Sequence, residues 1–298
     1  MYSFLLPVAY LPLCVHYLFA TLLWPVVYYV ARYRLKVVRG NLERCFPDKS
    51  PKERRKIERQ YYRHLCDLLA EGIYNLRAPL KSVGRHYRFD NEEVLEPYYR
   101  QNRSIVLMSS HYNNWEYMIT SLDSRISHHA IGVGKPLDNK GFGKFITSRR
   151  DRYGTEIVDQ TDVRQTMAYY DRWKVPVAYM MLSDQSPSNP HRSYWTRFMG
   201  QDSAFLFGAE HFARKYNMPV FIYEVTKERR GHYSVHFELL TDSPESMPEG
   251  AITEAYAKRL EAQIRRQPQY WLWSHRRWKL TRNGRIMKDG SIKIIKNQ

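Results

Sequence analysis

The chain lacks most of the motifs that identify a common enzyme class. Its 298 residues include only three cysteines, Cys14, Cys45 and Cys66, without a CxxC or zinc-like spacing. A disulfide framework is therefore not expected, and the low cysteine content is typical of a reducing compartment. The sequence also has no GxSxG, P-loop, HExxH or GxGxxG motif, so nothing in it indicates a serine-hydrolase, nucleotide or zinc-protease site. We expect no metal and no organic cofactor.

Acidic residues are scarce relative to basic ones. The chain has 30 Asp and Glu against 47 Lys and Arg, which gives a net charge of +17. Such an excess indicates an anionic partner. Composition alone leaves open a nucleic acid, an anionic membrane surface and an acidic carrier protein. The basic residues form no recognisable element for reading nucleic acid, and this disfavours the first of the three.

Charge is also missing from the first 31 residues, which contain no Asp, Glu, Lys or Arg. The apolar stretch Phe4–Val30 exceeds the roughly 20 residues that cross a bilayer. Four basic residues follow at once: Arg32, Arg34, Lys36 and Arg39. By the positive-inside rule we expect the rest of the chain to lie on the cytoplasmic side of the membrane. We therefore expect residues 1–31 to be a membrane anchor and residues 32–298 to be one domain.

Two other interpretations of this segment were weighed. No charge precedes the apolar stretch and no small-residue cleavage site follows it, so a cleaved signal peptide is not expected. Three prolines, Pro7, Pro12 and Pro25, interrupt it. They leave open a bent helix that lies in the membrane surface instead of crossing the bilayer.

Helical and extended patterns alternate along the rest of the chain. Strands are expected at 104–110, 129–134, 156–158, 175–182, 220–225 and 233–240. Helices are expected at 49–77, 114–123, 138–152, 162–172, 203–217 and 250–267, with a long loop at 186–201. This alternation predicts an α/β fold with a mainly parallel central sheet flanked by helices.

The most informative run is Ser109–Glu116, directly after an apolar strand. His111 falls on the turn at the strand's carboxyl end, where α/β sheets bind ligands. Glu116 falls in the first turn of the next helix, with Asn113 as its expected N-cap. Glu116 could then hold one imidazole nitrogen of His111 protonated, leaving the other as a general base towards a hydroxyl. Alternatively, Asn113-x-x-Glu116 is only a capping box that closes the helix.

Further segments carry a family resemblance. Arg34-x-Lys36-x-x-Arg39-x-Asn41-Leu42-Glu43-x-Cys45-Phe46-Pro47 resembles the segment after the anchor in late lipid A acyltransferases of the lauroyl and myristoyl type. Trp271–Lys279 resembles their carboxy-terminal signature. Between them, in the same order, lie His111-x4-Glu116, Lys135–Asn139, Asp184-Gln185 and Phe198–Gly200. That family belongs to the wider lysophospholipid and glycerol-phosphate acyltransferase superfamily.

The resemblance implies a membrane-bound enzyme whose acyltransferase domain is residues 32–298. Such an enzyme moves an acyl chain from acyl-carrier protein to a hydroxyl of an anionic lipid, here a lipid A precursor. In this interpretation His111 is the general base and Glu116 orients it. Lys135 stands where relatives commonly have Arg, so it supplies charge without a bidentate fork. Asn139 closes the same motif and is a candidate for substrate binding.

Four more residues are candidates for substrate binding. Arg149 and Arg150 lie on a basic helix and could contact phosphate on the acceptor or carrier, or form a solvated face. Asp184 and Gln185 follow a buried strand and could line the site, or only cap a turn. Two alternative functions stay open. One is the same chemistry on a lysophospholipid, aminolipid or glycolipid, and the other is a membrane-tethered nucleic-acid-binding protein. We expect no nucleic-acid partner.

Overall fold

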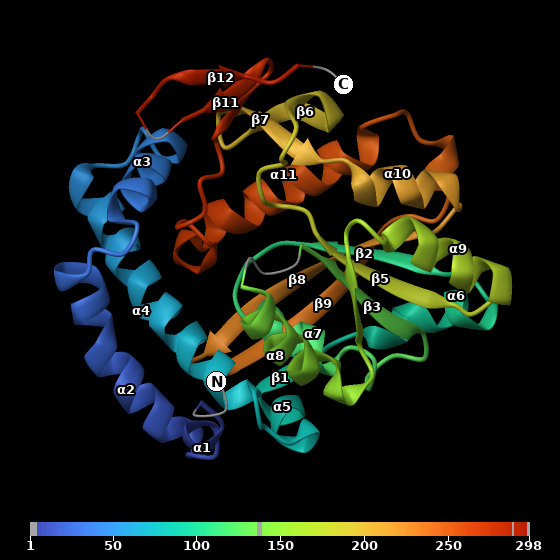
Figure 1. Cartoon of the computed structure of the whole chain (residues 1–298), viewed down its shortest axis with the longest axis horizontal. Coiled ribbons are helices and arrows are strands. Elements are labelled where there is room, and N and C mark those ends of the chain that lie inside the picture. The colour runs from blue at the N-terminus through green and yellow to red at the C-terminus, as the bar shows by residue number, and fades with distance from the viewer. Residues whose placement is uncertain (1–4, 136–138, 288, 297–298) are drawn as a thin grey trace.

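A twisted seven-stranded sheet occupies the centre of the computed structural model, which describes residues 5–135, 139–287 and 289–296 (Figure 1). Its order is β1-β9-β8-β2-β5-β3-β4, and only the β8–β9 pair is antiparallel. The strands are β1 (Tyr87–Phe89), β2 (Ile105–Ser109), β3 (His129–Gly134), β4 (Glu156–Asp159), β5 (Val177–Leu182), β8 (Val220–Arg229) and β9 (His232–Thr241). The predicted α/β fold with a mainly parallel sheet is confirmed.

Helices cover both faces of this sheet, and all five residues of β2 are therefore buried. Val106 and Met108 point into one core, whereas Ile105 and Leu107 point into the other. The first core is covered by α9 (Val163–Trp173), α10 (Gly208–Lys215) and α11 (Ala251–Arg266). The second is covered by α5 (Leu80–His86), α6 (Glu96–Arg100) and α7 (Trp115–Ser121). Helix α8 (Lys140–Arg150) lies beside α7.

The longest helix, α4 (Pro51–Asn75), begins at the predicted capping box. The Ser50 hydroxyl accepts the Glu53 N–H at 3.3 Å, and the Glu53 carboxylate accepts the Ser50 N–H at 2.7 Å. Two N–H groups that a helix start leaves without partners are thus satisfied. Helix α4, with α3 (Leu35–Cys45) at one end, runs along the side of the domain (Figure 1).

The apolar N-terminal segment is not one continuous helix. It consists of α1 (Leu5–Ala9), α2 (Leu13–Pro25) and a π-helical turn at Val26–Val30. Among the described residues, one helical stretch, Leu13–Val30, is long and apolar enough to cross a membrane by length and composition. Pro12 precedes α2 in an extended conformation, so the bend expected from the prolines separates α1 from α2.

Two expected elements were wrong. The loop at 186–201 and the start of the helix at 203–217 are a β-hairpin, β6 (Ser193–Phe198) and β7 (Gln201–Leu206). The turn is Met199-Gly200, where both residues have positive φ, 52° and 77°. Such a two-residue turn matches the twist of a hairpin. The third sheet, β10 (Leu280–Thr281), β11 (Gly284–Ile286) and β12 (Ile292–Ile294), ends the chain near this hairpin (Figure 1).

Candidate active site

Two neighbouring strands bring the polar residues of the site together. β2 and β5 are adjacent and parallel, with Ser109 opposite Leu182 at their carboxyl ends. His111 follows β2 by two residues, and Asp184 follows β5 by two residues. Because parallel strands end at the same edge of a sheet, the two side chains meet there, in the position where α/β sheets bind ligands.

Asp184 is the carboxylate that holds His111. Its Oδ1 lies 2.7 Å from His111 Nδ1, and its Oδ2 accepts the indole N–H of Trp271 at 2.9 Å. Burial opposes ionisation of this carboxyl group. The charge and hydrogen bond of His111, with the bond from Trp271, nevertheless bring the pKa of Asp184 below its ordinary value. An ionised Asp184 accepts a proton-bearing Nδ1 and leaves the Nε2 lone pair of a neutral imidazole available.

The second ring nitrogen of His111 faces Gln185. The Gln185 side-chain nitrogen lies 3.1 Å from Nε2, in the position of a donor to that lone pair. Trp115 packs edge-on against the imidazole with ring centroids 5.1 Å apart. The His111 side chain is 18% exposed. A substrate hydroxyl can replace the Gln185 amide as the partner of Nε2.

Glu116 does not make the contact with His111 that the sequence predicted. It lies in the first turn of α7 as expected, but its carboxylate makes a two-point ion pair with Arg150, at 2.9 and 2.5 Å. Trp115 Nε1 donates to the same carboxylate at 3.2 Å. Within the described chain, the carboxylate that contacts His111 is therefore Asp184, because β5 ends beside β2, and not Glu116.

The alternative capping interpretation is wrong as well. Asn114, and not Asn113, is the N-cap of α7, and its Oδ1 accepts the Tyr117 N–H at 2.9 Å. Asn113 has a φ of 54°, a left-handed conformation that asparagine tolerates. Its side-chain nitrogen donates to the Val225 carbonyl at 2.7 Å. This fixed turn lifts His111 out of the helix, which the sequence argument required.

The remaining predicted residues are spread along the same side of the sheet. Lys135 directly follows β3, the strand next to β5. Asn139 is the N-cap of α8, where its side chain accepts the Phe142 N–H at 3.0 Å. Arg149 lies over the Phe145 ring at 6.0 Å, and its neighbour Arg150 turns to Glu116 instead. Positions 136–138 of this motif lie outside the described residues.

Arg150 is held as a cation. Burial opposes its charge, but the adjacent Glu116 outweighs burial and raises the pKa of the guanidinium. The pair therefore presents a fixed cation on α8 beside α7. Guanidinium groups bind carboxylates and phosphates in such a two-point geometry, and here the Glu116 carboxylate occupies it.

The C-terminal segment forms a frame for this site. Trp271 pairs with Tyr112 in a backbone bridge, and the Tyr270 carbonyl accepts the Asn113 N–H at 3.1 Å. Trp271 therefore reaches Asp184 from a backbone that is fixed to the His111 turn. The sequence indicated this segment only as a signature, and it gave no signal that the Trp271 indole binds the Asp184 carboxylate.

The two segments that carry the family resemblance contact each other. The Asn41 side chain donates to the carbonyls of Trp273 and His275, both at 2.9 Å. Arg34 donates to the Ser274 carbonyl at 2.9 Å. Phe46 packs against the Trp273 ring. These contacts join the two segments into one support, which positions the Trp271 side of the site.

His275 secures the strand end that carries Asp184. Its Nε2 accepts the Ser186 N–H at 3.0 Å, which requires an unprotonated Nε2. Burial lowers the pKa of His275 to about 4. Nearby, Arg277 is buried among the rings of Phe198 and Phe205, and burial lowers its pKa to about 10. Because it is buried, Arg277 cannot contact a lipid headgroup at the surface.

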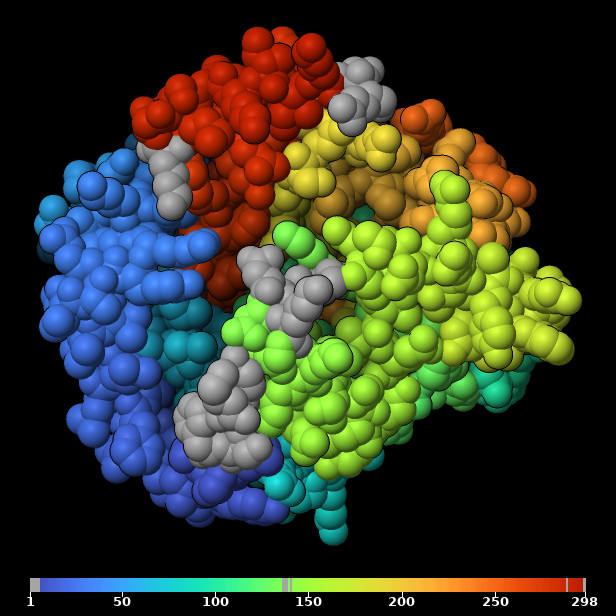
Figure 2. Space-filling model, in the orientation of Figure 1, coloured from blue at the N-terminus to red at the C-terminus, as the bar shows by residue number. Residues whose placement is uncertain are grey.

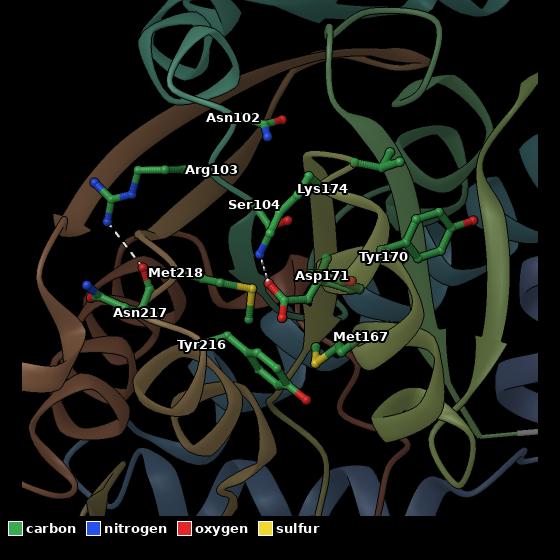
Figure 3. Close-up of a pocket in the computed structure, with 12 residues that line it drawn as sticks. Asn102, Arg103, Ser104, Met167, Tyr170, Asp171, Lys174, Tyr216, Asn217 and Met218 are labelled. Atoms are coloured by element: carbon green, nitrogen blue, oxygen red, sulfur yellow. Dashed lines mark hydrogen bonds and ion pairs between the residues drawn. The ribbon is translucent and has the colours of Figure 1, made fainter.

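A small pocket of about 110 Å³ lies at the other edge of the sheet (Figure 3). Ser104, Val175 and Met218 line it, and they precede β2, β5 and β8. The pocket thus lies at the amino ends of strands whose carboxyl ends carry His111 and Asp184. Its charged groups pair locally, with Lys174 bound to Asp171 at 3.3 Å. Among the residues described, no group of three or more His, Cys, Asp and Glu could hold a metal ion.

Comparisons with known proteins identify one family. The family model described as bacterial lipid A biosynthesis acyltransferase matches residues 2–280. A lipid A biosynthesis palmitoleoyltransferase of Escherichia coli (strain K12) is 24% identical over 251 residues, 83% of this chain and 79% of that protein. A lipid A biosynthesis lauroyltransferase of the same organism is 24% identical over 255 residues, 84% and 81%. A lipid A biosynthesis acyltransferase of Haemophilus influenzae is 25% identical over 262 residues, 84% and 79%.

Proposed function

The chain belongs to the bacterial lipid A biosynthesis acyltransferase family, and from this premise we propose that it transfers a fatty acyl chain from acyl-carrier protein to a hydroxyl of a lipid A precursor. His111 acts as the general base. The observation that carries this proposal is the bond between His111 Nδ1 and the buried Asp184 carboxylate, which leaves Nε2 as the ring nitrogen that does not bond to that carboxylate. We place the reaction at the cytoplasmic surface of the inner membrane.

The proposed step needs a base because a lipid hydroxyl is a weak nucleophile. The hydroxyl of the acceptor donates its hydrogen bond to His111 Nε2 and attacks the thioester carbonyl carbon as Nε2 takes the proton. The C–S bond then breaks, and the imidazolium returns the proton to the departing thiolate. Asp184 stabilises the imidazolium between these two transfers, as the carboxylate of a catalytic triad does.

The donor and the acceptor are both anionic, which suits this chain. An acyl-carrier protein is acidic, and the net charge of +17 favours its encounter with the enzyme. Arg150, fixed by Glu116, supplies a guanidinium for a phosphate on the acceptor or on the carrier's prosthetic group. In this proposal Glu116 is a positioning residue for Arg150. Lys135, Asn139, Arg149 and Gln185 are proposed to contribute to the same substrate-binding side.

Two measurements test the proposal: the lipid A composition of a deletion strain and the activity of the purified enzyme. A deletion strain should accumulate a lipid A species lacking one acyl chain, as seen by mass spectrometry, and the intact gene should restore the chain. The purified enzyme should transfer acyl groups from acyl-carrier protein to that accumulated species. Unchanged lipid A together with an altered phospholipid or aminolipid would assign another acceptor. Transfer from acyl-CoA but not from acyl-carrier protein would overturn the proposed donor.

A further inference from the structure

The apolar N-terminal helix is a docked part of the domain. Leu13–Val30 spans 18 residues, about 27 Å at 1.5 Å per residue, close to the ~30 Å thickness of a hydrocarbon core. However, it lies alongside α4 and does not project from the fold (Figure 1). In the space-filling view the same segment forms one flank of the molecule (Figure 2). If the helix enters a membrane in this position, the protein around it, α4 included, also contacts the membrane.

Buried carboxylates fasten both ends of the helix to α4. Near its start, the Tyr17 hydroxyl donates to Glu71 at 2.7 Å. In the π-helical turn, the Tyr28 hydroxyl donates to Glu58 at 2.6 Å. Both glutamates are buried, and both belong to α4. The protein-facing side of the segment is thus fixed to α4 by a polar contact near each end, and Ala20, Trp24 and Val27 pack against the apolar part of α4 between them.

Exposed arginines flank the segment at successive levels. Each guanidinium lies over an aromatic ring: Arg77 over Tyr10, just before the segment, at 4.8 Å, and Arg230 over Tyr17 at 4.4 Å and Arg63 over Trp24 at 4.6 Å within it. If the helix crossed a bilayer in this docked position, these cations would lie at every depth of the hydrocarbon, where charged side chains are costly. If the helix lies flat, all of them lie at one level and can reach headgroups.

The opposite side of the segment is apolar and uncovered. Its exposed large side chains follow helical spacing: Leu18, Phe19, Leu22, Leu23, Val26, Tyr29 and Val30. We call these seven residues the apolar face. An uncovered apolar stripe of this size marks a surface that binds a membrane or another protein.

Positive charge continues from the apolar face. Arg32, Arg34, Lys36 and Arg39 follow directly and surround a hollow at the start of α3. Such a cluster is complementary to anionic lipid headgroups. Charge complementarity therefore favours an anionic lipid surface as the occupant of the apolar face over a second copy of this basic chain.

We propose that Leu13–Val30 lies flat in one leaflet of an anionic membrane, with the apolar face towards the acyl chains and both ends on the side of the domain. The segment holds the enzyme against the membrane without crossing it. This inference rests on the contacts of α2 and does not depend on the acyl-transfer proposal.

Topology tests it first. Cys14 is exposed, whereas Cys45 and Cys66 are buried, so Cys14→Ser gives an unlabelled background. An uncharged tag with one cysteine is placed before Met1, and Tyr169→Cys reports the domain from α9. A membrane-impermeant maleimide is added to spheroplasts and to inverted vesicles. We expect the tag and Tyr169→Cys to label from the same side. Labelling from opposite sides would overturn the proposal.

Vesicle binding tests the apolar face itself. Leu18→Glu/Leu22→Glu places two charges on it, at side chains 59% and 63% exposed, and Tyr169→Glu/Trp173→Glu is the matched control on α9, at 58% and 62%. We expect the first variant to bind phosphatidylglycerol-containing vesicles at least tenfold more weakly than the control. Equal binding of the two variants would contradict the proposal. So would a change in oligomeric mass with unchanged vesicle binding, which would identify a self-association surface.

Discussion

Two carboxylates lie near the same turn, but their surroundings give them different roles. The Asp184 side chain is 3% exposed and bonds to a histidine and to an indole N–H. Glu116 is 28% exposed and pairs with a permanent cation, Arg150. A buried carboxylate beside an imidazole sets its tautomer and stabilises its protonated form. A carboxylate bound to arginine fixes that cation instead. Chemical type alone would not separate the two residues.

The largest loss of activity is expected when His111, the base that bonds to Asp184, is replaced. Replacing His111 with Ala removes the proton acceptor, so kcat should fall about 10³-fold, within the range typical of general-base catalysis. Steady-state transfer from acyl-carrier protein measures this loss, and circular dichroism checks that the variant folds. A variant with near-normal kcat would eliminate His111 as the base.

The comparison predicts a smaller but still large effect at Asp184. Asp184→Asn keeps the size of the side chain but removes the charge that selects the Nδ1–H tautomer, so kcat should fall about 10²- to 10³-fold with little change in KM. Wild-type turnover in Asp184→Asn would show that the observed bond has no catalytic role. Trp271→Phe serves as a milder control, because it removes one hydrogen bond to the same carboxylate and leaves its charge.

Acid should destabilise the fold around Asp184, because it protonates His275. Its pKa is about 4 in the folded chain and roughly 6.5 when unfolded. Between these values the unfolded state binds more protons, so stability falls as the pH drops from about 6.5 to about 4. The full loss is on the order of 3 kcal/mol for His275.

A His275→Gln variant isolates this contribution. Over the same pH range, the free energy of unfolding should decrease less in this variant than in the wild type. The difference between the two decreases should be on the order of 3 kcal/mol, and unfolding with a chemical denaturant measures it. Parallel curves for the two proteins would show that His275 titrates normally in the folded state.

The smallest effect is expected at the second carboxylate. Glu116→Gln keeps the shape but weakens the hold on Arg150, so KM should rise several-fold and kcat should fall about tenfold or less, because a partly exposed ion pair contributes modestly. If Arg150→Gln is combined with it, the two losses should not add, since both break one pair. A kcat loss equal to that of Asp184→Asn would return Glu116 to the role that the sequence suggested.

Much of the site could be predicted because the signals are local. The apolar run before His111 and the polar residues after Val175–Leu182 both mark strand ends, and the capping box at Ser50 marks the start of α4. These patterns depend on neighbouring residues only. His111, Asp184 and Gln185 were therefore placed correctly at the ends of strands from the sequence.

What could not be predicted depends on strand order and on backbone exceptions. The choice of Asp184 over Glu116 follows from β5 lying between β2 and β3, and no local pattern specifies that insertion. The positive φ of Asn113 moved the N-cap by one residue. The hairpin at Ser193–Leu206 was missed because its turn is Met199-Gly200 and its strands are partly exposed, which weakens the usual strand signals.

The central claim is that Asp184, and not Glu116, holds Nδ1 of His111. The most direct test is NMR of enzyme labelled with ¹⁵N-histidine, which reports the Nδ1–H proton of His111 and is assigned by its loss in His111→Ala. We predict a strongly hydrogen-bonded Nδ1–H resonance that disappears in Asp184→Asn and is retained in Glu116→Gln. A resonance that survives in Asp184→Asn and disappears in Glu116→Gln would contradict the account.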